Sequence, residues 1–254
     1  MATEEQIEQY RYFLKDTIRS QINFRTTDQA NGIPAPAPQK PCAPDATRHE
    51  LVPTGRFEHI SKISLVDAVR NRQSRRKFIN TPLSLEEISF LLWATQGVRE
   101  TAGDVATFRT VPSAGARHAF ETYVYAKQVE GLERALYRYL PLSHELVFEF
   151  GIERFGERIQ DACFDQAFIA TAAAVFVWTA IPYRTEWRYG LAAHKVIAMD
   201  AGHLCQNLYL ACEAIRAGTC AIGAYEQEKM DKLLHVDGKD EFTIYLAPVG
   251  KRKK

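Results

Sequence analysis

The chain has 254 residues, with 32 Lys and Arg against 31 Asp and Glu and a formal net charge of +1. This balance gives no general reason to expect nucleic acid or an anionic membrane as a partner. No apolar run reaches the ~18 residues that span a bilayer, and the first residues, MATEEQIEQY, lack the apolar segment of a secretory signal. The five scattered cysteines form no zinc pattern, so we expect reduced thiols in a cytoplasmic protein.

The N-terminal region differs in composition from the rest of the chain. Residues 4–20 predict a helix with one apolar face, formed by Ile7, Tyr10, Phe13, Leu14 and Ile18. The sequence DQANGIPAPAPQKPCAP that follows is rich in Pro and Ala and has no periodicity. It predicts an extended arm that lies on the main domain or on a partner subunit. We therefore expect a helix and arm over residues 1–60 and a compact domain over residues 61–254.

The compact domain alternates helical and strand patterns. Helices are predicted over residues 64–72, 85–97, 151–162, 192–216 and 226–234, the second of them opened by a capping box at Ser84 and Glu87. Strands are predicted over residues 119–127, 136–141, 145–150, 172–181 and 242–250. Residues 98–118 are expected to be irregular. This order suits an α+β fold, in which a central mixed or antiparallel sheet is flanked by helices.

The end of the first predicted domain helix carries a basic segment. Residues 72–77 hold four cations and one hydroxyl, in a chain that is otherwise almost neutral. If the backbone extends here, Arg72, Ser74 and Arg76 fall on one side, because side chains alternate along an extended chain. Two guanidinium groups around a hydroxyl suit a phosphate and the sugar chain beside it. Alternatively, the cations offset the negative end of the helix.

A segment of small residues follows the region expected to be irregular. Between Pro112 and His118, small side chains allow the backbone to approach a flat ligand closely. The N–H groups of Ser113 and Ala114 are candidates to face electronegative ring atoms, with Arg117 and His118 as polar groups at the rim. The alternative is an ordinary Gly-containing turn that enters a strand.

Two further segments carry possible binding groups. In the sequence TCAIGAY, after the long helix, Gly223 and Ala224 offer backbone N–H groups to a ligand; alternatively, this segment is a plain connection between two helices. The C-terminal sequence VGKRKK places four cations directly after the last strand. These cations either reach an anion or form a solvated tail, the latter especially at Lys254.

Taken in order, these segments resemble the nitroreductase family of flavin mononucleotide (FMN) enzymes. The resemblance covers roughly residues 60–250 and rests on SRRKF, LSLEEISFLLWATQGV, PSAGARHAFETYVY, LYRYLPLSHEL, DAGHLCQNLYLAC and CAIGAYEQE, closing on APVG. Within the family, the chain looks most like the SagB-type dehydrogenase branch, in which an N-terminal helix and arm are also familiar. The resemblance implies a homodimer with FMN at the subunit interface.

The resemblance also assigns roles to residues. It places the FMN phosphate and ribityl chain on Arg72, Ser74 and Arg76. It gives flavin contacts from the other subunit to Pro112, Ser113 and Ala114. Ala116 stands where the family often has Asn, which removes one side-chain hydrogen bond to the ring. The segment facing the ring, where a backbone N–H meets flavin N5, is Ile222, Gly223 and Ala224. Lys251 and Lys253 match basic residues that complete the phosphate site.

The resemblance implies an oxidoreductase that passes hydride or electrons between NADH or NADPH and a small organic acceptor, such as a quinone or nitroaromatic. The chain shows no Gly-rich dinucleotide fingerprint that would choose between the two nicotinamides. A second reading is an azoline (thiazoline or oxazoline) dehydrogenase that acts on modified peptides, and a third is a flavin-binding protein without turnover. Azoline oxidases are associated with a catalytic Lys-Tyr pair. The match here is Arg188-Tyr189, which keeps Tyr189 as a catalytic candidate but replaces Lys with a residue that stays protonated.

Overall fold

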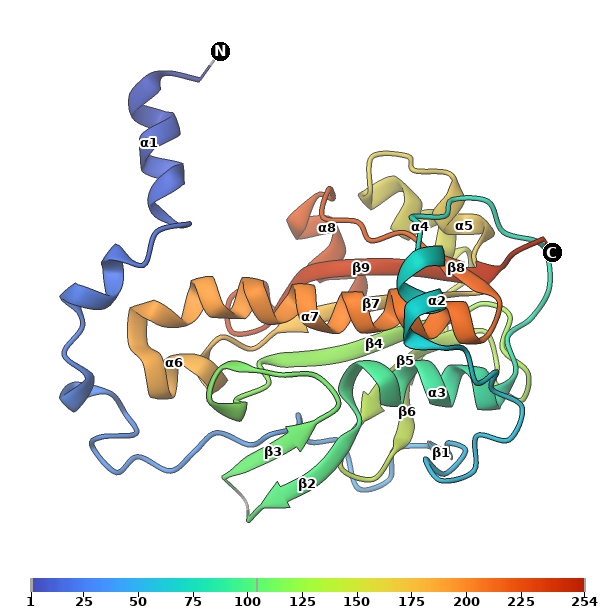
Figure 1. Ribbon diagram of the computed structural model, residues 1–254, viewed down its shortest axis with the longest axis horizontal. Coiled ribbons are helices and arrows are strands. Elements are labelled where there is room, and N and C mark those ends of the chain that lie inside the picture. The colour runs from blue at the N-terminus through green and yellow to red at the C-terminus, as the bar shows by residue number, and fades with distance from the viewer. Residues whose placement is uncertain (1, 104, 254) are drawn as a thin grey trace.

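The computed structural model describes residues 2–103 and 105–253 (Figure 1), so Lys254 of the basic C-terminus lies outside the described residues. Its centre is a seven-stranded sheet in the order β1-β6-β5-β4-β7-β9-β8. These strands are β1 (Arg48–Glu50), β4 (Phe120–Ala126), β5 (Ala135–Leu140), β6 (Glu145–Phe150), β7 (Ala174–Ala180), β8 (Ala217–Thr219) and β9 (Phe242–Lys251). Neighbouring strands all pair antiparallel, so the α+β prediction is confirmed in its antiparallel form.

Helices cover both faces of the sheet. In chain order, the helices of the described residues are α1 (Glu4–Tyr12), α2 (Leu65–Asn71), α3 (Leu85–Gln96), α4 (Phe155–Ala162), α5 (Phe168–Thr171), α6 (Tyr183–Tyr189), α7 (Ala193–Ala214) and α8 (Gln227–Leu234). Helices α3 and α7 share one hydrophobic core with the sheet, while α4, α5 and α8 build a second core on the opposite face (Figure 1). None of the described helices is long and apolar enough to cross a bilayer.

The central strands and the best-capped helix follow the sequence patterns closely. Every residue of β4 and β7 is buried, as expected for strands covered on both faces. Ser84 caps α3, since its hydroxyl accepts the Glu87 N–H while the Glu87 carboxylate accepts the Ser84 N–H. This reciprocal pair satisfies two backbone donors that the first helical turn leaves open.

Two expectations about local structure were wrong. Residues 98–118 are not simply irregular, because β2 (Val98–Ala102) and β3 (Ala106–Arg109) form a separate antiparallel hairpin, with Gly103 at a φ of 56° near its tip. The helix predicted over residues 4–20 ends at Tyr12, and a short 3₁₀ turn follows over Thr17–Gln21. Helix α1 contains no buried residue, so tertiary packing does not extend it.

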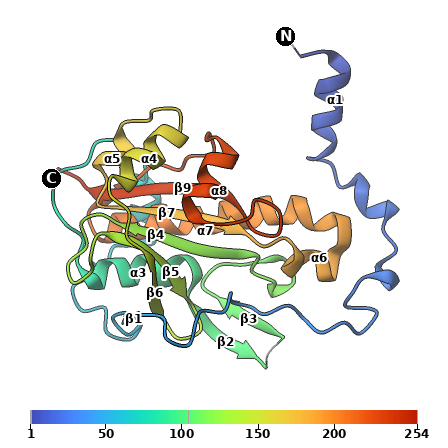
Figure 2. The same cartoon turned by 180° about the vertical axis from the view of Figure 1, so that it is seen from behind.

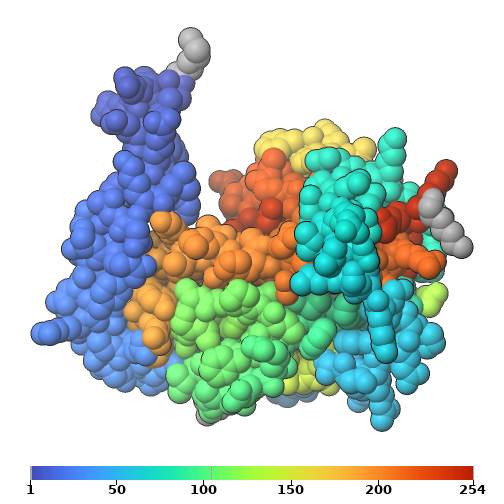
Figure 3. Space-filling view, in the orientation of Figure 1, coloured from blue at the N-terminus to red at the C-terminus, as the bar shows by residue number. Residues whose placement is uncertain are grey.

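The Pro-rich arm lies along its own domain. Gln29 and Ile33 exchange hydrogen bonds with Trp187, from Gln29 N–H to the Trp187 carbonyl (2.9 Å) and from Trp187 Nε1 to the Ile33 carbonyl (2.8 Å). The arm then passes beneath the sheet and adds β1 to the edge of β6 (Figure 2). Of the two locations expected for the arm, residues 29–50 occupy the surface of the main domain. By contrast, α1 stands away from the body of the molecule (Figure 3).

A network of buried charges fastens the arm. Glu121 on β4 accepts the Lys40 backbone N–H (2.8 Å) and contacts the guanidinium groups of Arg184 (2.5 Å) and Arg138 (3.4 Å). The Lys40 ammonium pairs with Glu241 (2.5 Å), and Arg138 donates to the Lys40 carbonyl (2.9 Å). Each cation therefore has a carboxylate partner, which is the condition under which buried charges are tolerated.

Candidate functional site

The basic segment continues from α2 as extended backbone, which is the condition for the alternation of side chains considered from the sequence. Arg72 has φ −54° and ψ 120°, and Ser74 bridges to Thr219 at the end of β8. The Arg75 side chain packs over Gly218 and reaches Glu213 (Nε to Oε1, 3.8 Å). The Ser74 hydroxyl instead contacts the Tyr209 hydroxyl of α7. Ser74 and Arg75 therefore contact different residues.

Tyr209 on α7 joins the basic segment to the TCAIGAY segment. Its hydroxyl lies 3.0 Å from Ser74 Oγ and accepts a hydrogen bond from the Ala221 N–H (2.8 Å). The Arg72 guanidinium lies over the Tyr209 ring, 5.3 Å from its centroid. Arg76 lies farther along the segment, over the Phe168 ring of α5 (5.8 Å). We call Arg72, Ser74, Arg76 and Tyr209 the Tyr209 cluster.

The TCAIGAY segment presents only part of its backbone. Ile222 is buried and exchanges two backbone hydrogen bonds with Leu246 (2.8 and 3.2 Å), which occupies its N–H. Gly223 and Ala224 are exposed. The backbone donors expected to meet a ligand therefore fall on Gly223 and Ala224, immediately after a residue that is fixed in the core.

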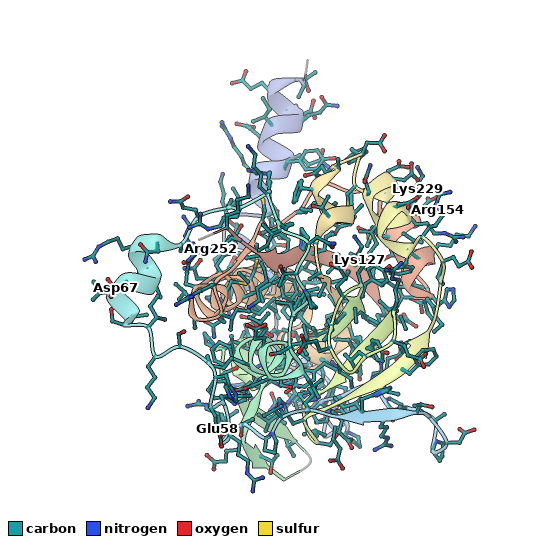
Figure 4. All side chains as sticks on the ribbon, turned by 90° about the vertical axis from the view of Figure 1, so that its right-hand side faces the viewer. Glu58, Asp67, Lys127, Arg154, Lys229 and Arg252 are labelled. Atoms are coloured by element: carbon teal, nitrogen blue, oxygen red, sulfur yellow. The ribbon has the colours of Figure 1, made fainter. Side chains whose placement is uncertain are left out.

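The basic C-terminus is largely paired. The Lys251 ammonium contacts the Glu87 carboxylate and the Ile215 carbonyl (2.8 Å). Arg252 pairs with Glu213 (2.8 Å) at the end of the chain (Figure 4), while Lys253 is exposed. Of the two predicted phosphate ligands here, Lys251 is already bound to an acid of its own chain.

The loop over residues 112–118 is strongly shaped. Positive φ angles occur at Gly115 (59°), Ala116 (53°) and His118 (47°), and the last two residues carry a Cβ, for which this conformation is uncommon. The His118 N–H donates to Ser113 Oγ (2.9 Å), which closes the loop on itself. The Ala114 N–H donates to Asp200 on α7 (3.1 Å). Burial raises the pKa of the Asp200 carboxyl above its ordinary value.

Arg117 and His118 do not stand at a rim, contrary to the sequence-based expectation. Both are buried; the Arg117 guanidinium stacks on the Trp187 ring (4.7 Å) and donates to the carbonyls of Val105 (2.7 Å) and Arg184 (2.9 Å). His118 has a positive φ (47°) just before β4. Arg117 and His118 therefore belong to the buried base of the loop.

Arg188 and Tyr189 close over the same loop. A Cβ added to Gly115 would lie 2.7 Å from the Tyr189 hydroxyl and 2.9 Å from Arg188 Cδ and Nε. Only glycine fits here, both because φ is positive and because these side chains lie so close. The structure therefore brings the Arg-Tyr pair together with the loop that contains Ser113.

The Tyr209 cluster and the loop over residues 112–118, here called the Ser113 loop, lie apart within one chain. The cluster includes Tyr209 and the loop contacts Asp200, and these two residues are nine positions apart on the same helix. Nine helical residues span about 13.5 Å. Among the described residues, no group of three or more His, Cys, Asp or Glu could hold a metal ion.

Sequence reasoning missed Tyr209 and Asp200. Tyr209 lies in an apolar helical pattern, and nothing in that pattern indicates that its hydroxyl would contact two other segments. Asp200 did give one, because it falls in register with the buried Ile197 and Leu204 of α7, where a charged residue is rarely placed without a partner.

Comparison with known proteins agrees with this architecture. The sequence model of the nitroreductase family matches residues 69–251. A candidate nitroreductase of Methanocaldococcus jannaschii is 35% identical over 193 residues, which are 76% of this chain and 93% of that protein. A candidate nitroreductase of Anabaena variabilis has a similar fold, with a TM-score of 0.66 and 24% identity. That match covers 83% of this chain but 42% of the longer Anabaena chain.

The microcin synthetase complex McbBCD of E. coli, with truncated pro-MccB17 bound, contains another chain of similar fold. It aligns over 100% of this chain and 99% of its own, with a TM-score of 0.61 and 15% identity. The extent of the family match and the identity to the Methanocaldococcus protein decide the assignment: this chain belongs to the nitroreductase family.

Proposed function

We propose that this protein is an FMN-dependent oxidoreductase that passes hydride or electrons from NADH or NADPH to a small organic acceptor, such as a quinone or nitroaromatic. Family membership supports a flavin oxidoreductase in general. That the flavin is FMN, that the reductant is NADH or NADPH, and that the acceptor is a quinone or nitroaromatic are parts of our proposal.

One observation carries the proposal. Arg72 and Arg76 lie in an extended segment beside an aromatic ring each, and neither forms an ion pair with a described residue. Arg75, between them, is turned toward Glu213. Two unpaired guanidinium groups with the Ser74 hydroxyl between them supply the donors that a phosphate and a ribityl chain require. We therefore assign these three residues to the FMN phosphate side, with Lys253 as a further contact.

The second half of the site is proposed to come from a partner subunit. Since the Ser113 loop and the Tyr209 cluster lie about 13.5 Å apart along α7 of one chain, we infer that one flavin meets Arg72 of one subunit and Ser113 of the other. Apolar residues at the surface of α2 and α7 support such an interface: Leu65, Val66, Val69 and Met199 are all more than half exposed. A folded, flavin-loaded monomer in light scattering would contradict this assembly.

The bound flavin would supply the redox chemistry, accepting hydride at N5 and returning electrons to the acceptor. The chain contributes binding and orientation. Arg72, Ser74 and Arg76 hold the phosphate end, while the exposed N–H groups of Gly223 and Ala224 face the ring. Cations near the ring favour its anionic reduced form through simple electrostatic attraction.

The first test is the purified protein itself. We expect a yellow protein with one FMN per subunit, whose flavin absorbance is bleached by NADH or NADPH under anaerobic conditions and restored by a quinone. Bound FMN that no nicotinamide reduces and no substrate oxidises would favour a flavin-binding protein without turnover. Protein without flavin, and unable to bind added FMN, would contradict the proposal.

Azoline dehydrogenation is the second candidate, and one observation favours it. The Tyr189 hydroxyl lies against the Ser113 loop, where a substrate at the flavin would be within reach. Oxidation of an azoline needs a base for the ring proton, and the neighbouring Arg188 is a poor one because guanidinium groups stay protonated. Efficient turnover of an azoline peptide by the unmodified protein, lost in Tyr189→Phe, would place this candidate first.

A further inference from the structure

A groove opens beside the Ser113 loop. It has a volume of about 760 Å³ and lies between the β2–β3 hairpin, the loop and α6. Its positively charged side chains are Arg99, Arg109 and Arg188, and Phe108 adds an exposed aromatic ring. Among the described residues, no Asp or Glu lines this groove. A lining with cations and no acid favours an anionic ligand.

The cations of the groove differ in availability. Arg109 is buried and spends its donors on Thr107 Oγ1 (3.1 Å), Gln96 Oε1 (3.0 Å) and the Pro38 carbonyl (2.7 Å). Arg109 therefore holds the groove wall and the arm together, and its donors are not available to a ligand. By contrast, the side chains of Arg99 and Arg188 are exposed.

Arg99 and Arg188 keep most of their donors. Arg99 donates only its Nε, to the Arg109 carbonyl (3.0 Å). The Arg188 guanidinium lies 5.6 Å from the centroid of the Tyr189 ring and forms no hydrogen bond or ion pair with a described residue. Guanidinium groups present several N–H donors in a fixed plane, which matches the oxygens of a carboxylate or phosphate.

The surroundings add positive charge to the groove. Arg117 and Arg184 lie behind it, and Glu121 is the carboxylate that pairs with Arg184. Burial, followed by the charges of Arg188 and Arg184, lowers the pKa of the Arg117 guanidinium, as expected where cations gather. Glu121 is also shared with Arg138. Arg138 has a closer partner in Glu149 (2.7 Å), whereas Arg117 pairs with no carboxylate among the described residues, so the positive charge around the groove is only partly offset.

The groove adjoins the proposed flavin site. Arg188 packs directly on Gly115 of the Ser113 loop, the loop that we assign to the flavin ring of the partner subunit. An anion held by Arg188 would thus place the rest of its molecule at that ring. This step rests on the proposed function.

We propose that the groove is an anion subsite, in which Arg188 and Arg99 bind a carboxylate or phosphate carried by the molecule that reacts at the flavin. The anion has two possible sources, the organic acceptor or the pyrophosphate of the nicotinamide dinucleotide. Both would bind through the same hydrogen bonds from guanidinium to oxygen. Pairs of substrates with and without the anionic group distinguish the two sources.

The kinetic test compares 4-nitrobenzoate with 4-nitrobenzamide as acceptors, and NADH with the uncharged reductant 1-benzyl-1,4-dihydronicotinamide. We expect Arg188→Gln to raise the KM of the anionic member of at least one pair about tenfold, which corresponds to about 1.4 kcal/mol, because the variant loses a charge-assisted hydrogen bond. The KM of the neutral member should stay within about twofold of its original value. Arg99→Gln should act in the same direction. Arg158→Gln, an exposed arginine on α4, is the matched control.

A binding measurement separates the subsite from the reaction. Benzoate and benzamide are titrated calorimetrically into the purified protein and into Arg188→Gln. Benzoate binding that is lost in Arg188→Gln supports the subsite even if no nicotinamide reduces the flavin, in which case only the proposed function fails. Turnover that is intact in Arg188→Gln, with no preference for the charged member in kinetics or calorimetry, would overturn the subsite and leave the proposed function standing.

Discussion

Two arginine-bearing regions of the molecule use the same side chain in opposite ways. In the buried network around Glu121, Arg138 and Arg184 each contact a carboxylate, and the network fastens the arm to the sheet. In the extended segment after α2, Arg72 and Arg76 lie over aromatic rings without an acid partner among the described residues. A paired guanidinium fixes structure, whereas an unpaired one at a partly open surface is available to a ligand.

The comparison also separates stability from binding. Removing one partner of a buried ion pair leaves an uncompensated charge, which is strongly destabilising. Removing a cation that has no partner in the protein costs little folding energy and affects only the ligand it would hold. Variants in the two regions should therefore differ in which property they change.

The largest effect is expected for Glu121→Gln. This change leaves Arg184 without its carboxylate in the interior and weakens the contact to Arg138, so we expect the free energy of unfolding to fall by about 3–5 kcal/mol. Urea denaturation measures it, with Glu58→Gln at an exposed position as control. A loss below about 1 kcal/mol would show that the network adds little stability.

A pH dependence is expected from His118. Burial, followed by the Arg109 charge, lowers the pKa of His118 to about 3 in the folded protein. The unfolded chain takes up this proton near pH 6.5, so it binds more protons than the native state between these two values. The contribution of His118 to the free energy of unfolding is therefore fully present above about pH 6.5. It decreases as the pH drops toward 3, by up to about 1.4 kcal/mol per pH unit.

Chemical denaturation at a series of pH values checks this dependence, and a His118→Gln variant should show a shallower slope over the same range. An unchanged slope in the variant would mean that other groups cause the acid sensitivity.

The smallest effect is expected at Lys251, which the sequence assigned to the phosphate site. Because its ammonium already contacts Glu87, Lys251→Met should lower the free energy of unfolding by about 1 kcal/mol and change FMN affinity less than twofold. Equilibrium titration with FMN and urea denaturation give both numbers. A tenfold loss of FMN affinity at unchanged stability would return Lys251 to the group of ligand-binding cations.

Local patterns predicted much of the fold. The unbroken apolar run of β7 and the capping box of α3 have local causes, β-branched residues in one case and reciprocal hydrogen bonds in the other. The β2–β3 hairpin was missed because its strands are short and mostly exposed, so they show no apolar alternation. The course of the arm was left open because long-range contacts, such as Arg109 to the Pro38 carbonyl, have no local signature.

The candidate site was predictable only in part. Alternation along the extended chain separated Ser74 from Arg75, and the structure gives these two side chains different partners. The joining role of Tyr209 and the groove formed by Arg99 and Arg188 depend on residues distant in sequence. Those positions become recognisable only once the sheet and α7 are in place.

We propose above all that Arg72 and Arg76 bind the flavin phosphate. The affinity of the protein for FMN tests this assignment most directly. The dissociation constant is measured by quenching of flavin fluorescence for the original protein, Arg72→Ala, Arg76→Ala and the control Arg70→Ala, whose side chain pairs with Asp67 on α2. We expect a loss of about 10- to 100-fold for Arg72→Ala and for Arg76→Ala, since each removes a charge-assisted bond of about 1.5–3 kcal/mol. We expect unchanged affinity for Arg70→Ala and, in the FMN-free protein, unfolding free energies within about 1 kcal/mol of the original for all three variants. Full FMN occupancy in both Arg72→Ala and Arg76→Ala would contradict the assignment.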